Sequence, residues 1–157
     1  MKEHRYEITS TWTGNLGTGT SSYRAYTRDH EIKGAEKLCA IPGSADPAFR
    51  GDKQRYNPED LLVSALSTCH MLSFLHVCVN AGVVVTAYVD RASGTMRETE
   101  DGGGHFIEVT LHPVVTITDG ARAGEMDALH HKAAELCFIA RSVNFPVRHE
   151  ASVVVEN

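Results

Sequence analysis

The sequence has 157 residues, a length that fits one domain with its own core. Hydrophobic residues make up 42% and charged residues 22%, which is ordinary for a globular protein and excludes a disordered or fibrous chain. The net charge of −5 is spread along the chain without a run of Lys or Arg, which argues against nucleic acid or an anionic membrane surface as the main partner. A small or neutral substrate fits this charge better.

The N-terminal segment, residues 1–12, alternates polar and apolar residues and lacks the apolar core of a signal peptide. No stretch approaches the ~20 apolar residues of a membrane span. We therefore expect a soluble, cytoplasmic protein with no membrane partner.

Two segments near the N-terminus, residues 3–12 and 21–33, alternate with the two-residue period of half-buried strands. The Gly-rich segment TGNLGTGTS joins them and predicts a hairpin. Residues 39–56, CAIPGSADPAFRGDKQRY, hold Pro, Gly, Asp and Ser without periodicity and predict a long connection. Loops of that length inside compact domains tend to be functional.

A long helix is predicted from Asn57 to about Asn80. Asn57 is a good N-cap, Pro58 suits the first helical position, and the next two residues place negative charge where the helix dipole favours it. Apolar residues cover nearly the whole circumference, which indicates a helix buried on most sides.

Two further strands are predicted at residues 83–97 and 105–118, separated by the Gly-rich ETEDGGG. A second helix is predicted over about 121–140, and residues 149–156 supply a closing strand. The order of strands, helix, strands, helix and strand predicts an α+β fold, and no repeat or linker divides the single domain expected over residues 1–157.

The four cysteines, Cys39, Cys69, Cys78 and Cys137, form no CxxC pair or zinc-finger spacing. Each one taken alone is most simply a small buried hydrophobe. Cys69 lies mid-helix on the buried stripe and Cys137 lies on the inner face of the second helix, so packing of the two helices favours this pair. Cys78 is rotated by roughly 900° from Cys69, which places it on the opposite side of its helix.

A thiol that reduces peroxide must be a thiolate, and a free cysteine with a pKa of about 8.5 is only a few per cent ionised at neutral pH. Arg50 and Arg55, in the loop before the long helix, are the candidate cations, and Glu59 could hold one of them in a bidentate pair. However, ten residues of helix separate Glu59 from Cys69 by about 15 Å along the axis. The two can meet only if the helix breaks, or if a loop or a second subunit bridges the gap.

The segment NPEDLLVSALSTCHMLSFLHVC, with HHKAAELCFIARSVNFPV downstream, resembles the OsmC/Ohr family of thiol-dependent hydroperoxide reductases, specifically its OsmC-like branch. The likeness spans almost the whole chain. Its most specific part is NPE, a cysteine ten residues later and a second helical cysteine far downstream. The resemblance implies an OsmC-like fold, with antiparallel sheets wrapped around two long central helices in an intertwined homodimer and two active sites at the interface.

The resemblance also implies roles for individual residues. Cys69 matches the peroxidatic cysteine, Cys137 the resolving cysteine, and Glu59 the glutamate after NP. Arg50 aligns best with the arginine of the OsmC type, which can come from the other subunit, and Arg55 stays open as an alternative. The Ohr type places this arginine in the first hairpin loop, where residues 13–21 contain none.

The reaction implied is peroxidase chemistry on organic hydroperoxides, with hydrogen peroxide as a further substrate. Cys69 becomes a sulfenic acid and then forms a disulfide with Cys137. An external dithiol, such as a lipoyl group, restores both thiols, and no cofactor is expected. The alternative is a non-catalytic OsmC-like dimer that binds a small apolar ligand at its interface, and the presence of the full set of site residues favours the enzyme.

The nine histidines do not predict a metal site, because adjacent side chains such as His130 and His131 diverge by about 100° on a helix and no HExxH motif is present. We expect His70 and His76 to be core or interface histidines. Four apolar residues could form a wall for an alkyl chain, although core packing explains them equally well: Leu72, Phe74, Phe138 and Phe145.

Overall fold

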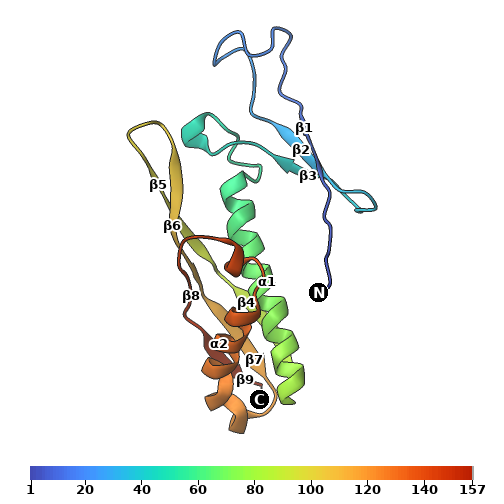
Figure 1. The fold of residues 1–157 in the computed structure, drawn as a ribbon, viewed down its shortest axis with the longest axis vertical. Coiled ribbons are helices and arrows are strands. Elements are labelled where there is room, and N and C mark those ends of the chain that lie inside the picture. The colour runs from blue at the N-terminus through green and yellow to red at the C-terminus, as the bar shows by residue number, and fades with distance from the viewer. Residues whose placement is uncertain (157) are drawn as a thin grey trace. The chain divides into compact units, whose positions relative to one another are not determined.

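The computed structural model describes residues 1–156, and the chain forms two compact units, Met1–Leu61 and the part from Leu62 onward. The first unit contains a three-stranded antiparallel sheet in the order β1-β2-β3. Its strands, in blue to cyan in Figure 1, are β1 (Thr9–Trp12), β2 (His30–Lys33) and β3 (Ile41–Gly43).

The predicted N-terminal hairpin is present, since β1 pairs with β2 from Thr9↔Lys33 to Trp12↔His30. Its strands are shorter than the predicted ranges 3–12 and 21–33. The Asn15 side chain accepts hydrogen bonds from the backbone N–H groups of Gly17 and Gly19, at 2.9 and 3.0 Å, and so folds the connecting segment into a local turn. Such side-chain turns compete with the strand ladder, which is why the pairing ends early.

The predicted long connection, residues 39–56, contains β3 and one short 3-10 turn at Pro47–Phe49. The Asp46 side chain caps this turn by accepting a hydrogen bond from the Ala48 N–H at 2.7 Å. The remainder is irregular, as the composition predicts.

The long helix α1 (Pro58–Ala81) begins at the predicted N-cap. Asn57 Oδ1 accepts a hydrogen bond from the Asp60 N–H at 2.7 Å, and Asp60 Oδ2 accepts one in return from the Asn57 N–H at 3.3 Å. This reciprocal pair is a capping box, and it satisfies two backbone donors at the helix start. The predicted beginning of α1 is confirmed.

α1 ends in a Schellman motif, the usual helix stop built on glycine. Gly82 has φ +69°, a left-handed conformation in which side chains are strained. The Val83 N–H donates to the Cys78 carbonyl at 2.9 Å, and the Gly82 N–H donates to the Val79 carbonyl at 3.1 Å. The helix therefore runs unbroken for 24 residues.

By length and composition α1 is a candidate membrane span, with a mean hydropathy of 1.7. The expectation that no stretch approaches a span is therefore wrong for this helix. The core helix of a soluble protein passes the same test, and one face of α1 packs into a protein core described below. The absence of a membrane partner stays a prediction.

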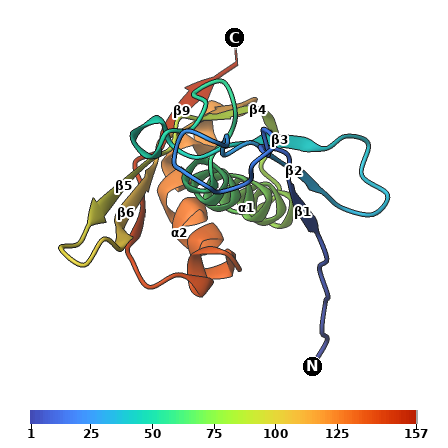
Figure 2. The same cartoon turned by 90° about the horizontal axis from the view of Figure 1, so that it is seen from above.

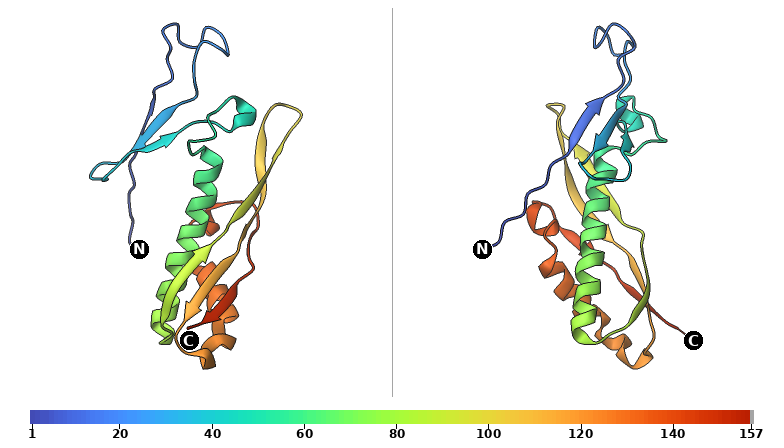
Figure 3. Two further views of the ribbon diagram at one scale, coloured as in Figure 1. Left: turned by 180° about the vertical axis from the view of Figure 1, so that it is seen from behind. Right: turned by 90° about the vertical axis from the view of Figure 1, so that its right-hand side faces the viewer.

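The second unit carries two three-stranded sheets, in the orders β4-β7-β9 and β5-β6-β8. The views in Figures 1 and 3 show these strands running alongside α1. The bounds of the strands are β4 (Val85–Asp90), β5 (Ser93–Glu98), β6 (Gly104–Leu111), β7 (Pro113–Ile117), β8 (Val147–His149) and β9 (Ser152–Val155).

Each of the two strands predicted at 83–97 and 105–118 is split in two. β5 and β6 form the hairpin around the predicted Gly-rich turn, and β4 pairs with β7. The two breaks lie together, because Asp90 Oδ1 accepts a hydrogen bond from the His112 N–H at 2.7 Å. Pro113 follows directly and has no N–H to continue the ladder.

The C-terminal segment supplies two strands where one was predicted. β8 runs parallel to β6 and β9 runs parallel to β7. The expectation of purely antiparallel sheets is therefore wrong for these two pairings. Parallel neighbours need a crossover connection, and the helical segment between β7 and β8 provides it.

The second helix, α2 (Met126–Leu136), has 11 residues and is shorter than the predicted range of about 121–140. The expectation of two long central helices in a homodimer stays a prediction. Short 3-10 segments precede and follow it, at Gly120–Glu125 and Ala140–Ser142. Glycine is a poor helix former, and Gly120 and Gly124 account for the late start. Cys137 leaves the helix in an extended conformation, with φ −72° and ψ 106°.

Two cores hold the second unit together, and Figure 2 shows α2 lying beside α1 at the larger one. The larger core joins α1, β7 and α2 through Phe74, Val77, Cys78, Val83, Val115, Ile117, Met126 and Ala133. The smaller core joins α1 and β6 through Leu66, Val109 and Leu111. The predicted mixed α+β class is confirmed.

Candidate active site

Two thiols lie side by side in the second unit. Cys69 is half-buried in the middle of α1, and Cys137 is 1% exposed at the residue where α2 ends. Burial, and then a hydrogen bond with the Cys69 side chain, raise the pKa of the Cys137 thiol to about 11. The two cysteines paired by sequence reasoning are therefore adjacent, although Cys137 comes from the end of the second helix and not from its inner face.

The other two cysteines lie elsewhere. Cys78 is fully buried in the larger core, where burial raises the pKa of its thiol to about 11. Cys39 is exposed in the connection before β3. A buried thiol of raised pKa is chemically inert, so Cys78 acts as a packing residue.

An apolar groove of about 640 Å³ opens onto Cys69. Leu72 of α1 and Phe138, one residue beyond Cys137, line it and are 63% and 77% exposed. Of the four residues considered for an apolar wall, these two take that position. Phe74 and Phe145 do not, because Phe74 lies in the larger core and Phe145 packs against the smaller one.

Glu59 lies in the first turn of α1, ten residues before Cys69 on one uninterrupted helix. A rise of about 1.5 Å per residue separates them by about 15 Å. Of the explanations left open by the sequence, a break in the helix is therefore excluded. Glu59 cannot contact the thiol of its own chain along this helix.

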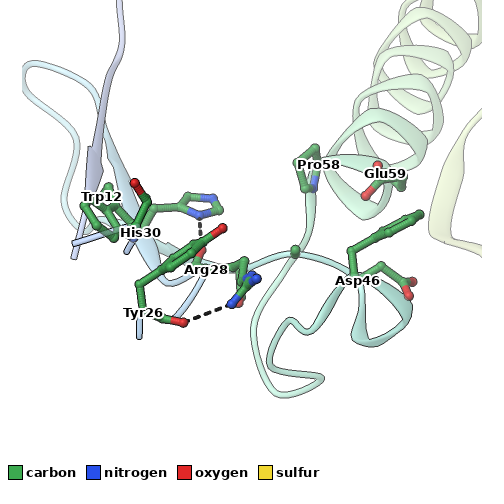
Figure 4. A pocket seen from close by; sticks show the side chains of 11 residues that line it. Trp12, Tyr26, Arg28, His30, Asp46, Pro58 and Glu59 are labelled. Carbon is green, nitrogen blue, oxygen red and sulfur yellow. Dashed lines mark hydrogen bonds between the residues drawn. The ribbon is translucent and has the colours of Figure 1, made fainter. Parts of the chain in front are cut away.

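Glu59 lines a second pocket, of about 440 Å³, which lies entirely within the first unit. Figure 4 shows Trp12, Tyr26 and His30 on one side of this pocket and Pro58 and Glu59 on the other. The pocket is lined by both aromatic side chains and charged side chains of both signs.

The arginine in the Glu59 pocket is Arg28, which sequence reasoning missed. Its Nη1 donates to the Tyr23 and Tyr26 carbonyls, at 2.9 Å each, and its guanidinium carbon lies 4.1 Å from the centre of the Tyr26 ring. The alternation of Tyr26, Arg28 and His30 is the signal that could have found it, because residues two apart share one face of an extended chain.

The two arginines named from the sequence have other neighbours. The Arg50 guanidinium lies 5.6 Å from the centre of the Tyr23 ring, and the Arg50 backbone has φ +66° at the end of the 3-10 turn. Arg55 Nε lies 3.9 Å from carboxylate oxygens of both Asp29 and Asp52. The participation of Arg50 or Arg55 in a site stays a prediction.

The expectation of a core histidine is confirmed for His70, which is buried and has its Nε2 3.0 Å from Nδ1 of His130. His76 instead lines the apolar groove. Within residues 1–156, no group of three or more His, Cys, Asp or Glu side chains is placed to hold a metal ion.

Comparison with known proteins supplies the family. A family model described as OsmC-like protein matches residues 51–152. The chain belongs to the OsmC-like family. This match covers α1, both thiols and the strands from β4 to β8, so the predicted family is confirmed. No match is found among curated proteins.

Solved structures with a similar fold cover nearly the whole chain. An OsmC-like protein of unknown function from Vibrio cholerae is 28% identical, with a TM-score of 0.86, and the alignment covers 96% of this chain and 100% of that one. An organic hydroperoxide resistance protein from Elizabethkingia anophelis, with thiocyanate bound, is 19% identical at a TM-score of 0.68, covering 99% and 100%. An organic hydroperoxide resistance protein OsmC from Legionella pneumophila is 17% identical at 0.68, with the same coverage. The present chain shares the fold of all three.

Proposed function

We propose that this OsmC-like protein is a thiol-dependent peroxidase that reduces organic hydroperoxides, with hydrogen peroxide as a further substrate. The observation that carries the proposal is the adjacent pair of thiols, of which Cys69 alone lines the open groove. The names of the Elizabethkingia and Legionella proteins support the same chemistry. A cytoplasmic location, where free thiols persist, is part of the proposal.

The order of the two thiols follows from their surroundings. A peroxide in the groove reaches Cys69, whereas Cys137 is buried and, with a pKa of about 11, stays protonated at neutral pH. The Cys69 thiolate attacks one peroxide oxygen, the O–O bond breaks, and the other oxygen leaves as an alcohol or water. Cys69 is then a sulfenic acid.

The second step joins the two sulfurs. Cys137 attacks the Cys69 sulfenic acid, an S–S bond forms, and the sulfenic oxygen leaves as water. An external dithiol, for which a lipoyl group is our candidate, exchanges with the disulfide and becomes oxidised while both cysteines return to thiols. The protein needs no resident cofactor for this cycle.

The groove favours organic substrates over hydrogen peroxide. Leu72 and Phe138 expose large apolar side chains beside Cys69, and an alkyl chain that covers them leaves water. Each buried CH₂ contributes about 0.8 kcal/mol to binding. Hydrogen peroxide has no such chain, so it gains nothing from this contact.

An intertwined homodimer completes the proposed site. Glu59 cannot reach Cys69 on its own helix, so a second copy supplies Glu59, together with Arg50 as the family resemblance implies. Exposed apolar residues on α1, such as Leu72 and Val79 at 63% and 76%, support coverage by another chain. Arg28, which shares the pocket of Glu59, is the second candidate for the arginine.

Mixing two inactive variants tests this arrangement. Cys69→Ser lacks the peroxidatic thiol and Glu59→Gln lacks the carboxylate, so each homodimer should be nearly inactive. Random co-refolding gives heterodimers with one intact site, and activity should return to about a quarter of the wild-type value. Activity that stays at the level of the two separate variants would contradict a site shared between copies. A larger loss of peroxidase activity in Arg28→Lys than in Arg50→Lys would identify Arg28 as the arginine of the site.

The peroxidase itself is tested by consumption of cumene hydroperoxide with excess dithiol. Cys69→Ser should abolish turnover, whereas Cys78→Ser, a matched change on the same helix in the core, should retain it if the variant folds. Unchanged consumption by Cys69→Ser would remove the enzymatic role of this residue.

The second candidate function is a non-catalytic dimer that binds a small apolar ligand. The groove volume of about 640 Å³ lies within the ~300–1,000 Å³ range of ligand pockets. If peroxide leaves all four thiols intact while an apolar fluorescent probe binds at Leu72, this function replaces the peroxidase.

A further inference from the structure

Three histidines that the peroxidase steps above do not use lie together in the second unit: His70 on α1, His130 on α2 and His149 on β8. The His70 and His130 rings are almost parallel, at 4°, and share the 3.0 Å contact between Nε2 and Nδ1. The centre of the His149 ring lies 5.5 Å from that of His70 and 5.7 Å from that of His130. Ring nitrogens point within the ring plane, so three rings this close to parallel do not converge on one ion.

The hydrogen bond between His70 and His130 fixes which nitrogens are free. His130 is 0% exposed and its Nε2 has no partner, with the Phe74 ring stacked 3.9 Å away. We assign the His130 proton to Nδ1, which then donates to His70 Nε2, because the other tautomer would bury an unpaired N–H. His70 then carries its own proton on Nδ1. Of the three rings, only His149 is left to accept a proton from the side of the cavity.

A cavity of about 150 Å³ connects this cluster with Cys137. His70, His149 and Cys137 all line it, together with Arg141 and Arg148. At about 30 Å³ for each water molecule, the cavity has room for a short water chain. The resolving thiol, His70 and His149 therefore face the same small cavity.

Disulfide formation requires Cys137 to lose its proton. With a pKa of about 11, only about one molecule in 10⁴ carries the thiolate at pH 7. The backbone N–H of Ala140, 3.5 Å from Cys137 Sγ, favours the anion but takes no proton. A nearby base is needed for a fast second step.

We propose that His149 accepts the proton of the Cys137 thiol through the cavity during disulfide formation, and that the His70–His130 pair holds the His149 ring in place; this inference rests on the proposed peroxidase function. The Cys137 S–H proton moves to His149 while the Cys137 sulfur bonds to the Cys69 sulfur. The sulfenic oxygen leaves with the bonding electrons and takes a proton from solvent to become water. The imidazolium then returns its proton to solvent, so atoms and charge balance.

The charges around the cluster limit it to one proton. Burial, and next the neighbouring histidines, lower the pKa of His70 to about 4 and that of His130 to about 3. A positive charge on His149 is one of the causes in both cases, so a proton on His149 keeps the other two rings neutral. Three other charged groups lie near the cluster. Asp90 on β4 favours a charge on His70. Arg141 and Arg148 line the cavity, and Arg148 is paired with Glu108 on β6.

The test follows the second step alone. Wild-type protein, His149→Asn and the control His131→Asn, whose ring is exposed on the outer side of α2, are each mixed with one equivalent of cumene hydroperoxide at a series of pH values. Dimedone trapping measures Cys69 sulfenic acid, and peptide mass measures the Cys69–Cys137 disulfide. In wild type the conversion rate should pass through a plateau in pH, because an unprotonated imidazole takes the proton in place of hydroxide, and the plateau should end as the pH approaches the Cys137 pKa of about 11.

In His149→Asn the conversion at pH 7 should be slower by about 10²-fold and should rise about tenfold per pH unit, following the thiolate. Added imidazole should restore part of the rate, which a purely structural defect would not allow. His131→Asn should behave as wild type. Equal rates and pH profiles in wild type and His149→Asn would overturn the proposal. A wild-type pH profile without a plateau would also overturn it, and this second test does not depend on whether His149→Asn folds. Absence of both sulfenic acid and disulfide at Cys69 would instead refute the peroxidase function.

Discussion

The reaction of Cys78 with iodoacetamide tests how strongly the fold suppresses a thiol. At pH 7 a thiol with a pKa of about 11 is ionised in about one molecule in 10⁴, against about 3% for an ordinary thiol with a pKa of about 8.5. Ionisation alone therefore slows alkylation of Cys78 by about 300-fold relative to the unfolded chain, and burial slows it further.

The assay compares native protein with protein unfolded in urea and follows each cysteine by peptide mass. The exposed Cys39 serves as the internal control and should react at similar rates in both states. Raising the pH should speed the native Cys78 reaction about tenfold per unit up to its pKa of about 11. A native rate within tenfold of the unfolded rate at pH 7, in protein that stays folded, would refute the reasoning.

Three further predictions concern stability and the second thiol. Because burial lowers the pKa values of His70 and His130 to about 4 and 3, the unfolded chain binds more protons than the folded chain below about pH 6.5. The free energy of unfolding, measured with urea, should therefore be constant above that pH and fall towards pH 4. The same dependence of this free energy on pH in His130→Leu would contradict the explanation. Asn57→Ala should lower the free energy of unfolding by about 1 kcal/mol because it removes the capping box of α1, whereas Asn57→Gly should cost only a few tenths, and equal urea midpoints for the two variants would speak against the cap. Cys137→Ser should leave Cys69 as a long-lived sulfenic acid that dimedone traps after one equivalent of peroxide, while rapid disappearance of the adduct without a disulfide would argue against Cys137 as the resolving thiol.

The sequence predicted α1 well because its signals are local. Asn57 and Gly82 mark the two ends of the helix, and the hydrogen bonds there join residues no more than five apart. The fixed φ of Pro58 suits the first helical position. The strands of the second unit were less predictable. Their breaks depend on the Asp90 side chain and the His112 N–H, which are 22 residues apart, and no periodicity within one segment records such a contact.

The thiol pair was predicted for a partly wrong reason. Helical spacing placed Cys137 on an inner helical face, but α2 ends at Leu136, and the extended Cys137 reaches Cys69 from the turn that follows. The predicted pairing was still correct because Cys137, one residue beyond the helix end, lies close to the last turn of α2. The buried cluster of His130 and His149 could not be predicted, since it joins α2 and β8 to α1 through tertiary packing alone.

One measurement tests the central claim most directly. Reduced protein receives one equivalent of cumene hydroperoxide, and peptide mass maps the state of all four cysteines. The account predicts rapid formation of a single Cys69–Cys137 disulfide, reversed by a dithiol, with Cys39 and Cys78 unchanged. Four unmodified thiols, or a disulfide that excludes Cys69, would contradict it.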